Sequence, residues 1–340
     1  MLWRFIPMRI SFEEMVNVMK EKLMSYGVSE EVAYGCAKNL TENTQYGVAS
    51  HGVNRFPRVI AMLKQGSIKP DAKPTLVNAM GALEQWDGNL GMGNTNASIC
   101  MDRAVELAKQ YGIGCVALRH TNHWQRAGTY GAQAAKAGCV GICWTNTMPN
   151  MPAWGAKNRR IGNNPLVFCI PYKDDYVMID GAMAQFSYGA IEAAKINERE
   201  LPVPGGFDKD GNITRNPVAI EETWRVLPIG FWKGSGFSVL MDMLATSLSG
   251  GMSVSDIGAQ GDTPTDEYNL SQVFIAINVV DKEANDEAVR QIIADMKSSE
   301  PADEGSEILY PYEKELSLYS ESLKNGIPVD EGVWQTVLKL

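Results

Sequence analysis

The sequence has 340 residues, of which 45% are hydrophobic and 21% are charged. This length suffices for one large domain or two to three smaller ones, and the composition argues against disorder. The net charge of −9 argues against a nucleic-acid partner, because phosphate binding needs a basic surface. No apolar run approaches the roughly 20 residues that span a bilayer, so we expect no membrane partner.

The cysteines indicate a reducing compartment, and we expect a cytoplasmic protein. They stand singly in apolar stretches without a C-x-x-C pair, which favours buried free thiols over zinc ligands. The six are Cys36, Cys100, Cys115, Cys139, Cys143 and Cys169. The start, Met1 to Pro7, is too short for a secretory signal, and it could be a leader before a natural start at Met8.

Helix signals dominate the first part of the chain. Ser11 and Glu14 form a capping box, apolar residues follow at helical spacing, and Gly27 ends the pattern. A second helix is expected from Ser29 to about Asn43. Similar patterns, each ended by a glycine, predict helices over residues 94–110 and 127–137.

After residue 138 the pattern changes to short apolar runs of strand length, separated by turn residues. Strands are predicted over residues 140–144, 166–171, 176–179 and 271–280. Helices are predicted from Gly236 to Gly250 and over residues 285–297, 314–324 and 331–340. Because helices and strands are partly segregated, the pattern favours an α+β fold. We expect an N-terminal helical region over residues 8–75, joined by residues 300–340, and an α+β region over residues 76–299 that binds nucleotide and substrate.

A glycine pattern at residues 112–117 matches G-x-G-x-x-A without the context of a dinucleotide-binding turn. That turn requires a strand before the glycines and a helix after them. Here a helix precedes Gly112, and the strand-like residues 116–118 follow Gly114. The order therefore argues against a Rossmann fold.

The first candidate for chemistry is the segment around His51. Reducing a ketone by hydride leaves an alkoxide, and a histidine is well suited to supply the proton. The hydroxyl of Ser50 could fix the tautomer of His51, while Arg55 and Arg58 could clamp a carboxylate. The alternative is a helix end that carries solvated polar residues.

The other two histidines, His120 and His123, lie in a loop between a predicted strand and a predicted helix. Their spacing could suggest zinc, but no third ligand with suitable spacing is evident. We therefore expect a polar substrate loop and no metal.

Two further segments could contact an anionic ligand or a nucleotide. The run Trp232-Lys233-Gly234-Ser235-Gly236 precedes a predicted helix, and a helix N-terminus with a lysine suits a pyrophosphate. Asp180 ends a predicted strand and could accept hydrogen bonds from ribose hydroxyls, or it could cap a turn.

Several separated motifs together resemble the second malate/L-lactate dehydrogenase family, which is unrelated to the Rossmann dehydrogenases. The resemblance extends over nearly the whole chain from Met8. It rests on Ser50-His51-Gly52, Asn122-His123-Trp124, Trp154-Gly155-Ala156-Lys157, Gly162-Asn163-Asn164-Pro165-Leu166, Trp232-Lys233-Gly234-Ser235-Gly236, and the stretches GALEQWD, GICWTN and FSYG.

The resemblance implies an NAD(H)-dependent enzyme, with NADP(H) as the alternative cofactor, built on a mainly antiparallel sheet flanked by helices. It also implies a homodimer with active sites near the subunit interface. The proton donor would match His51, but allied family members assign this role to a histidine that matches His123. The cofactor would contact Tyr176, Val177, Met178, Ile179, Asp180, Gly181 and Ala182, then Trp232 and Lys233, and finally Tyr312, Glu313 and Lys314. Tyr312 departs from the family's Pro-Gly-Glu pattern, where glycine is usual.

The expected substrate is a small anionic 2-oxo sugar acid. Relatives that act on malate or lactate carry small residues after the histidine–aromatic pair, whereas this chain has Gln125 and the donor-rich Arg126. We expect Arg126, with Ser50, Arg55 and Arg58, to bind the longer hydroxylated substrate. The alternative is that Gln125 and Arg126 face solvent. Other family substrates (malate, lactate, ureidoglycolate or a cyclic imino acid) remain open, as does a catalytically silent sugar-acid-binding protein.

Overall fold

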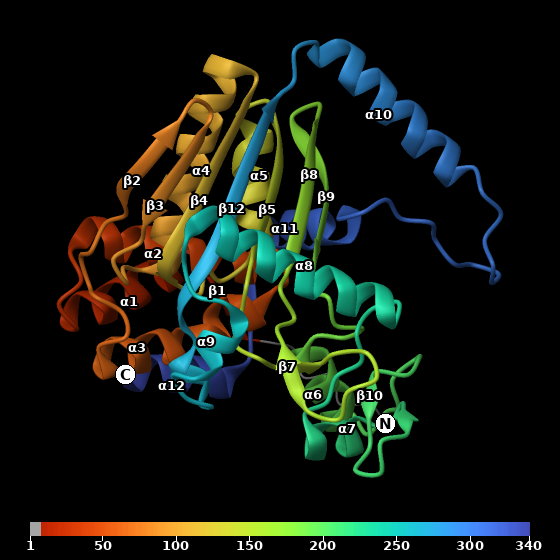
Figure 1. Cartoon of the computed structure of the whole chain (residues 1–340). Coiled ribbons are helices and arrows are strands. Elements are labelled where there is room, and N and C mark those ends of the chain that lie inside the picture. Colours follow the sequence, from red (N-terminus) through yellow and green to blue (C-terminus); the bar gives the residue numbers. More distant parts are fainter. Residues whose placement is uncertain (1–7) are drawn as a thin grey trace.

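A seven-stranded sheet forms the centre of the computed structural model, which describes residues 8–340 (Figure 1). The strand order is β2-β3-β4-β12-β5-β8-β9. The bounds are β2 (Thr75–Met80), β3 (Leu83–Asp87), β4 (Ile113–Asn122), β5 (Cys139–Thr145), β8 (Leu166–Tyr172), β9 (Asp175–Gly181) and β12 (Tyr268–Asn278). Strands β3 and β4 run parallel and the other neighbours in the sheet run antiparallel. The predicted mainly antiparallel α+β architecture is confirmed.

The glycine pattern at residues 112–117 belongs to the connection between a helix and a strand. Helix α4 (Gly93–Tyr111) ends at Gly112, which has φ 88°, and β4 begins at the next residue. A Cβ on Gly114 would approach the carbonyl oxygen of Ala104 to 2.1 Å, so this glycine allows the strand to pack closely on α4. The exclusion of a Rossmann turn is therefore confirmed.

Helices cover both faces of the sheet. Helices α4 and α5 (Gly128–Lys136) pack with β4, β5, β8 and β9 around a core that includes Tyr130 and Phe274. Helix α8 (Trp232–Ser249) lies on the opposite face (Figure 1). Strand β4 alternates accordingly, because Val116 and Leu118 join the first core whereas Ala117 joins the core beneath α8.

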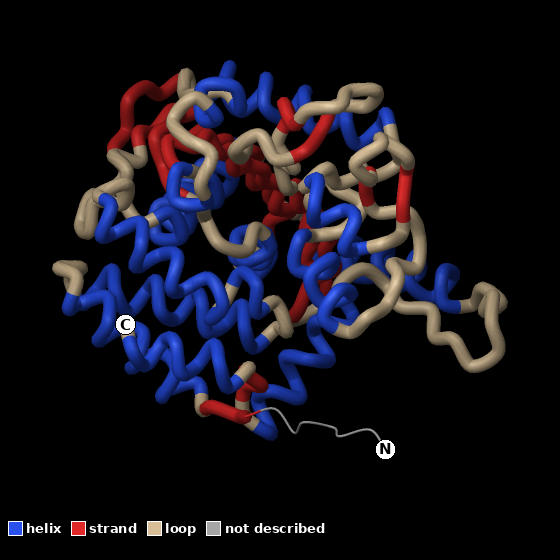
Figure 2. Tube along the Cα trace, turned by 90° about the horizontal axis from the view of Figure 1, so that it is seen from below, coloured by secondary structure: helices blue, strands red, loops and turns tan. Residues whose placement is uncertain are grey.

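A helical layer unites the two ends of the described chain. It contains α1 (Phe12–Ser25), α2 (Glu30–Gln45), α3 (Phe56–Gln65), α12 (Glu331–Lys339), and β1 (Met8–Ile10) paired antiparallel with β13 (Ile327–Val329) (Figure 2). Ser11 caps α1, as predicted, by accepting the Glu14 amide at 3.1 Å. The shared core supports joining residues 300–340 to the N-terminal region, but the domain boundaries stay a prediction. The possible leader at residues 1–7 lies outside the described residues.

A third part, formed by residues 148–163 and 182–231 on either side of β8 and β9, packs below the sheet around a core of its own. It comprises β6 (Met151–Pro152), β7 (Arg159–Ile161), α6 (Tyr188–Ile196), β10 (Gly206–Phe207), β11 (Ile213–Thr214) and α7 (Pro217–Thr223). The remaining elements are α9 (Val254–Gly258), α10 (Lys282–Lys297), α11 (Glu313–Asn325) and the 3-10 turns η1 (Ala49–His51), η2 (Val53–Arg55) and η3 (Pro264–Asp266). The elements of the third part are short, and the sequence patterns did not resolve them.

Helix α8 begins earlier than predicted. Its first residue is Trp232, so Trp232 to Gly236 form the first turn and not a loop before the helix. Gly234 is buried, and a Cβ there would approach the Ile229 carbonyl oxygen to 2.3 Å. The glycine is required for this close approach and does not mark a break in the helix.

The shared core predicts that α12 stabilises the N-terminal helices, and this can be tested. Trp334 of α12 is 1% exposed within the core formed with α1 to α3, whereas Leu338 of the same helix is 40% exposed. We expect Trp334→Ala to lower the free energy of unfolding by about 3–5 kcal/mol. Leu338→Ala should change it by no more than about 0.5 kcal/mol. Urea unfolding measures both, and equal effects would contradict the proposed joining of the C-terminal region.

Candidate active site

Two of the three histidines lie face to face, although 72 positions separate them in the sequence numbering. The ring centroids of His51 and His123 are 5.7 Å apart and the ring planes differ by 18°. His51 ends η1, just after α2, and His123 directly follows β4. The sequence predicted both as candidates, and the structure brings them together.

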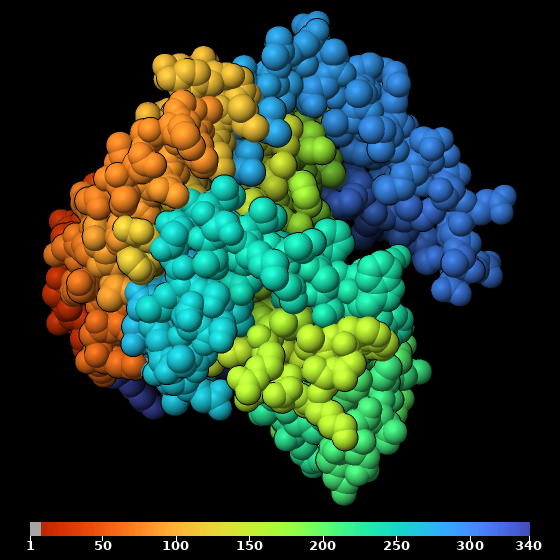
Figure 3. Space-filling model, viewed as in Figure 1, coloured from red at the N-terminus to blue at the C-terminus, as the bar shows by residue number. Residues whose placement is uncertain are grey.

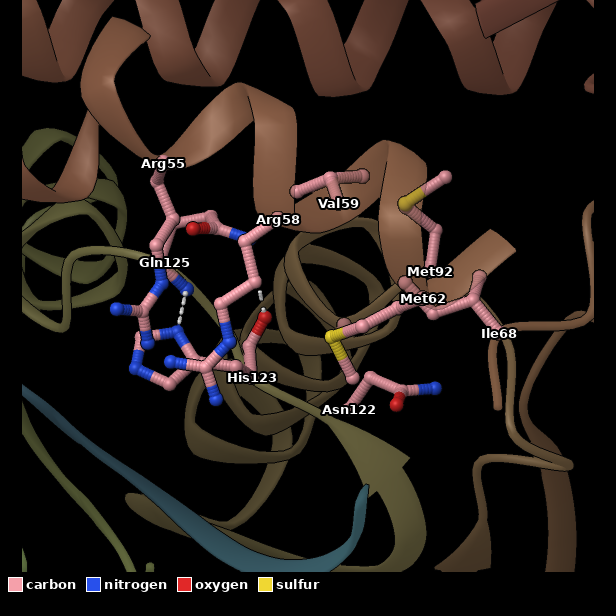
Figure 4. Close-up of a pocket in the computed structure, with 10 residues that line it drawn as sticks. Arg55, Arg58, Val59, Met62, Ile68, Met92, Asn122, His123 and Gln125 are labelled. Atoms are coloured by element: carbon pink, nitrogen blue, oxygen red, sulfur yellow. Dashed lines mark hydrogen bonds between the residues drawn. The ribbon is translucent and has the colours of Figure 1, made fainter. Parts of the chain in front are cut away.

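Each ring has a local hydrogen-bond partner. The Gln125 amide donates to Nδ1 of His123 at 3.0 Å, so in its neutral form His123 carries its proton on Nε2 (Figure 4). Gln125 has φ 69°, and this turn of the backbone brings its amide back to the ring. Ser50 Oγ lies 3.2 Å from Nδ1 of His51, and the hydroxyl can donate or accept there. The predicted Ser50–His51 contact is therefore present.

The segment that carries His51 is fastened to α2 and α5. Asn43 donates to the His51 carbonyl at 3.0 Å, and it accepts from Thr129 of α5 at 2.9 Å. Gly52 lies so close to α2 that a Cβ would approach Thr44 Oγ1 to 2.2 Å. These contacts give His51 a fixed place beside the sheet.

Arg55 and Arg58 line a small pocket together with His123 and Gln125 (Figure 4). Arg55 ends η2 and Arg58 lies in the first turn of α3, which follows directly. The other end of the pocket is lined by apolar side chains, namely those of Val59, Met62, Ile68 and Met92. The predicted constellation of Ser50, His51, Arg55 and Arg58 is thus assembled at one place.

A buried carboxylate that the sequence analysis missed faces both arginines. Glu267 is 5% exposed, and its Oε2 accepts from Nη2 of Arg58 at 2.8 Å and lies 3.7 Å from Nη2 of Arg55. Helix α6 also reaches the site, since a Cβ on Gly189 would lie 3.6 Å from Cβ of Ser50. In the sequence, only the FSYG stretch, which ends at Gly189, had indicated that the start of α6 belongs to the site.

Burial and the arginine charges together hold both imidazoles neutral. Burial, followed by the charges of Arg55, Arg126 and Arg58, lowers the pKa of His51 to about 3. Burial, Arg55 and the neighbouring ring also lower the pKa of His123 well below its ordinary value. An anion placed beside the arginines would oppose these effects and raise both pKa values.

Arg126 and Gln125 are buried, with 4% and 5% exposure, so the alternative that they face solvent is wrong. The Arg126 guanidinium lies over the neighbouring rings of Tyr46 and Tyr312, 4.8 and 4.9 Å from their centroids. Its Nε is 3.7 Å from Asp180. Gln125 lines the pocket of His123, whereas Arg126 lies to one side of it, so substrate binding by Arg126 stays a prediction.

The predicted cofactor stretch forms strand β9 and the residue after it. Tyr176 and Met178 point into the core beside α5, while Val177 and Ile179 lie on the more exposed face. Asp180 accepts the Gly128 amide at 2.8 Å, so it caps the start of α5 and not a turn. Burial raises the pKa of its carboxyl group. Gly181 and Ala182 follow, half-buried.

The other predicted cofactor residues lie in two places. Tyr312 adopts φ 80° and packs against Tyr176 and Arg126, so this turn lies beside β9. Glu313 accepts the Tyr310 amide at 3.0 Å, and Lys314 follows in the first turn of α11. Trp232 and Lys233 are exposed at the start of α8. Within residues 8–340 of this single chain, no hydrogen bond or ion pair joins Trp232 or Lys233 to the two histidines.

The third histidine belongs to a different cluster. Nδ1 of His120 lies 2.8 Å from Asp87, which also accepts from Arg119. Among residues 8–340, no group of three or more histidine, cysteine, aspartate or glutamate side chains is arranged to hold a metal ion. None of the helices in that range is long and apolar enough to cross a membrane.

The fold and the histidine–arginine pocket define a dehydrogenase of the non-Rossmann type, and comparisons with known proteins specify its family. A profile described as malate/L-lactate dehydrogenase matches residues 10–338. The chain is 46% identical to the 2,3-diketo-L-gulonate reductase of Escherichia coli O127:H6 over 336 residues, which are 98% of this chain and 100% of the relative. The chain therefore belongs to the malate/L-lactate dehydrogenase family and is an oxidoreductase acting on CH–OH or keto groups.

Solved structures agree with this assignment. Sulfolactate dehydrogenase from Methanocaldococcus jannaschii superposes with a TM-score of 0.89 at 31% identity, covering 97% of this chain and 95% of the other. Malate dehydrogenase from Entamoeba histolytica superposes with a TM-score of 0.91 at 26% identity, covering 98% and 97%. The shared architecture thus extends over nearly the whole length of each protein.

The lowered pKa of His51 predicts the direction in which the stability of the protein changes with pH. The unfolded chain protonates this imidazole near pH 6.5, but the folded protein resists protonation until about pH 3. Stability should therefore fall as the pH drops through this window, by on the order of 1 kcal/mol per pH unit for this ring. His51→Gln removes this contribution and should lose less stability between pH 7 and pH 5. Parallel losses in urea unfolding of both proteins would contradict a neutral buried ring.

Proposed function

We propose that this protein is an NADH-dependent reductase of a small 2-oxo sugar acid, most specifically of 2,3-diketo-L-gulonate to 3-keto-L-gulonate. One observation carries the proposal: a neutral imidazole, His123, lines a pocket with two arginines, and the neutral ring of His51 stacks on it. The relatives named 2,3-diketo-L-gulonate reductase support the substrate, since they match the full length of the chain at 46% identity. Reduction of malate-type, lactate-type, ureidoglycolate-type or cyclic imino-acid substrates is the alternative.

In the proposed reaction, the substrate carboxylate binds the arginine side of the pocket. Arg55 and Arg58 orient the 2-oxo acid so that its keto oxygen meets an imidazole. A nicotinamide, when bound, would supply the hydride to the keto carbon. The bound carboxylate offsets the arginine charges and raises the pKa of His51, so the ring takes up a proton from solvent and gives it to the developing alkoxide, while Ser50 hydrogen-bonds to Nδ1 of the ring. The ring ends the step neutral, which is the state that burial and the arginine charges favour.

His123 is the competing proton donor, because it lines the arginine pocket and its ring stacks on that of His51. Its Nδ1 accepts the Gln125 amide, so Nε2 is the nitrogen that could deliver a proton. The same backbone contact holds the ring in place. We propose His51 as the donor and His123 as the ring that orients the keto oxygen.

The cofactor is proposed to bind along β9 and the turn at Tyr312. Two buried polar atoms support this location, because Nη2 of Arg126 and the hydroxyl of Tyr312 have no hydrogen-bond partner among residues 8–340. Both suit a polar ligand that carries negative charge. Asp180 and Gly181 would hold the ribose side, with Tyr176 to Ala182 as the wall of the site. NADPH is the alternative cofactor.

The protein is further proposed to act as a homodimer. Helix α8, teal on the surface in Figure 3, has an exposed apolar strip formed by Phe237, Leu240, Met243 and Leu244. Exposed apolar patches of this kind often mark protein interfaces. A partner on this strip would lie next to Trp232 and Lys233, and it would cover the start of α8.

The substrate and the proton donor are tested together with purified enzyme and NADH. We expect kcat/KM for 2,3-diketo-L-gulonate to exceed that for pyruvate or oxaloacetate by at least about 10²-fold. His51→Asn should lower kcat by about 10²–10⁴-fold and leave NADH binding nearly intact, because general acid catalysis alone is lost. A larger loss in His123→Asn than in His51→Asn would reverse the two roles. Equal turnover of all three oxo acids would exclude the proposed substrate.

Lys233 provides a separate test of the cofactor site. If it binds the phosphates or a ribose, Lys233→Ala should raise KM for NADH by about tenfold, as expected for a lost charged contact, and change KM for the oxo acid less. Lys209→Ala, in the exposed hairpin between β10 and β11, serves as the matched control. An effect on the oxo acid as large as that on NADH would contradict the assignment.

A further inference from the structure

Glu267 connects three segments of the chain at the active-site pocket. It lies between η3 and β12, and it is 5% exposed. Oε2 accepts from Nη2 of Arg58 at 2.8 Å, and Oε1 accepts the Met148 amide at 3.3 Å. Both oxygens of the carboxylate are therefore engaged, which fixes its position.

The two arginines are not equivalent in their contact with Glu267. Arg58 forms a hydrogen bond with it, whereas Nη2 of Arg55 lies at the longer distance of 3.7 Å. Arg58 is thus held by the protein itself, and Arg55 keeps more of its donors free for a ligand. This difference assigns Arg55 as the main contact for a substrate carboxylate and Arg58 as its support.

The charges around the pocket leave a single positive charge uncompensated. Two guanidinium groups face one carboxylate, and both imidazoles are neutral. Arg126, which lies nearby, has its own counter-charge in Asp180 at 3.7 Å. One bound carboxylate would complete the neutralisation, whereas a second negative charge would be desolvated without a partner, and this is costly.

We propose that Glu267 determines the charge class of the substrate: it fixes Arg58, cancels one of the two arginine charges, and thereby makes the site selective for monoanionic over dianionic oxo acids. This inference rests on the proposed reduction of a 2-oxo acid in the same pocket. A sugar acid carries one carboxylate, whereas malate and oxaloacetate carry two. Glu267 is in this view a positioning residue, because it acts through the arginines.

Two small anions of nearly equal size test the inference by binding. Oxamate carries one negative charge at neutral pH and oxalate carries two. Calorimetry with the NADH-loaded protein should show oxamate binding at least about tenfold more tightly than oxalate, as the cost of one unpaired charge predicts. Glu267→Gln adds one uncompensated positive charge and should shift this ratio about tenfold toward oxalate. Glu267→Asp keeps the charge and should keep the preference for oxamate.

The matched control is Glu84→Gln. Glu84 of β3 is also a buried carboxylate, 3% exposed, and it pairs with Arg103 at 2.7 Å away from the histidines. We expect this variant to lose stability and to keep the ligand ratio of the unmodified protein. An equal shift in Glu84→Gln would overturn the inference, as would an unchanged ratio in Glu267→Gln.

The remaining outcomes separate the inference from the proposed function. If Glu267→Gln does not fold, the unmodified protein and Glu267→Asp decide the question. Tighter binding of oxalate by the unmodified protein, or loss of the oxamate preference in Glu267→Asp, would overturn the charge argument. If neither anion binds and no oxo acid is reduced, the proposed function fails as well. If a 2-oxo acid is reduced but the ratio of oxamate to oxalate affinity does not change in Glu267→Gln, only the proposed role of Glu267 is wrong.

Discussion

The arrangement of the site depends on keeping two guanidinium groups close together in a partly buried pocket. Arg55 and Arg58 have side chains only 22% and 18% exposed, and like charges at such short range repel each other strongly when water is scarce. Glu267 makes this possible by neutralising one of them. What remains is an attraction for one anion, and the same arginine charges add to burial in lowering the pKa of both histidines. Affinity for the substrate and the protonation state of the site thus share one electrostatic contribution.

The sheet brings these groups together through the register of two neighbouring strands. Asn122 at the end of β4 pairs with Tyr268 at the start of β12. His123 follows Asn122 and Glu267 precedes Tyr268, so the antiparallel pairing puts both at the same end of the sheet. The turns η1 and η2 then present His51 and Arg55 from the helical layer. The pocket therefore forms where this layer meets the end of the sheet.

The part of this site that is local in the sequence could be predicted, and the part that depends on strand register could not. Ser50, His51, Arg55 and Arg58 lie within nine consecutive residues, so the segment alone indicated that they could act together. Glu267 is 209 positions from Arg58, and only the pairing of β4 with β12 brings it near. Helices with clear caps, such as α1 after Ser11, were predicted well because capping is a local interaction.

Local conformation also decides what the patterns left open or misplaced. An exposed first helical turn was the alternative for Gln125 and Arg126, but the positive φ of Gln125 redirects the chain and both side chains are buried. The start of α8 was placed too late because Gly234 was interpreted as a loop residue. Its actual role is a close contact with Ile229, five residues earlier, in the turn that leads into α8. The glycine itself does not reveal whether such a turn precedes the helix or forms its first residues.

The electrostatic contribution that affinity and protonation share also bears on the order of events in the proposed reaction. Linkage requires that if the arginine charges disfavour protonation of His51, an anion that neutralises them favours it by a corresponding free energy. The empty pocket therefore holds a neutral ring, and the ring gains basicity when the carboxylate arrives. A proton acquired in this way lies beside the keto oxygen only when a substrate is bound. The site thus forms its acid together with the complex that needs it, because burial and the arginine charges both disfavour the protonated ring until a carboxylate offsets the charges.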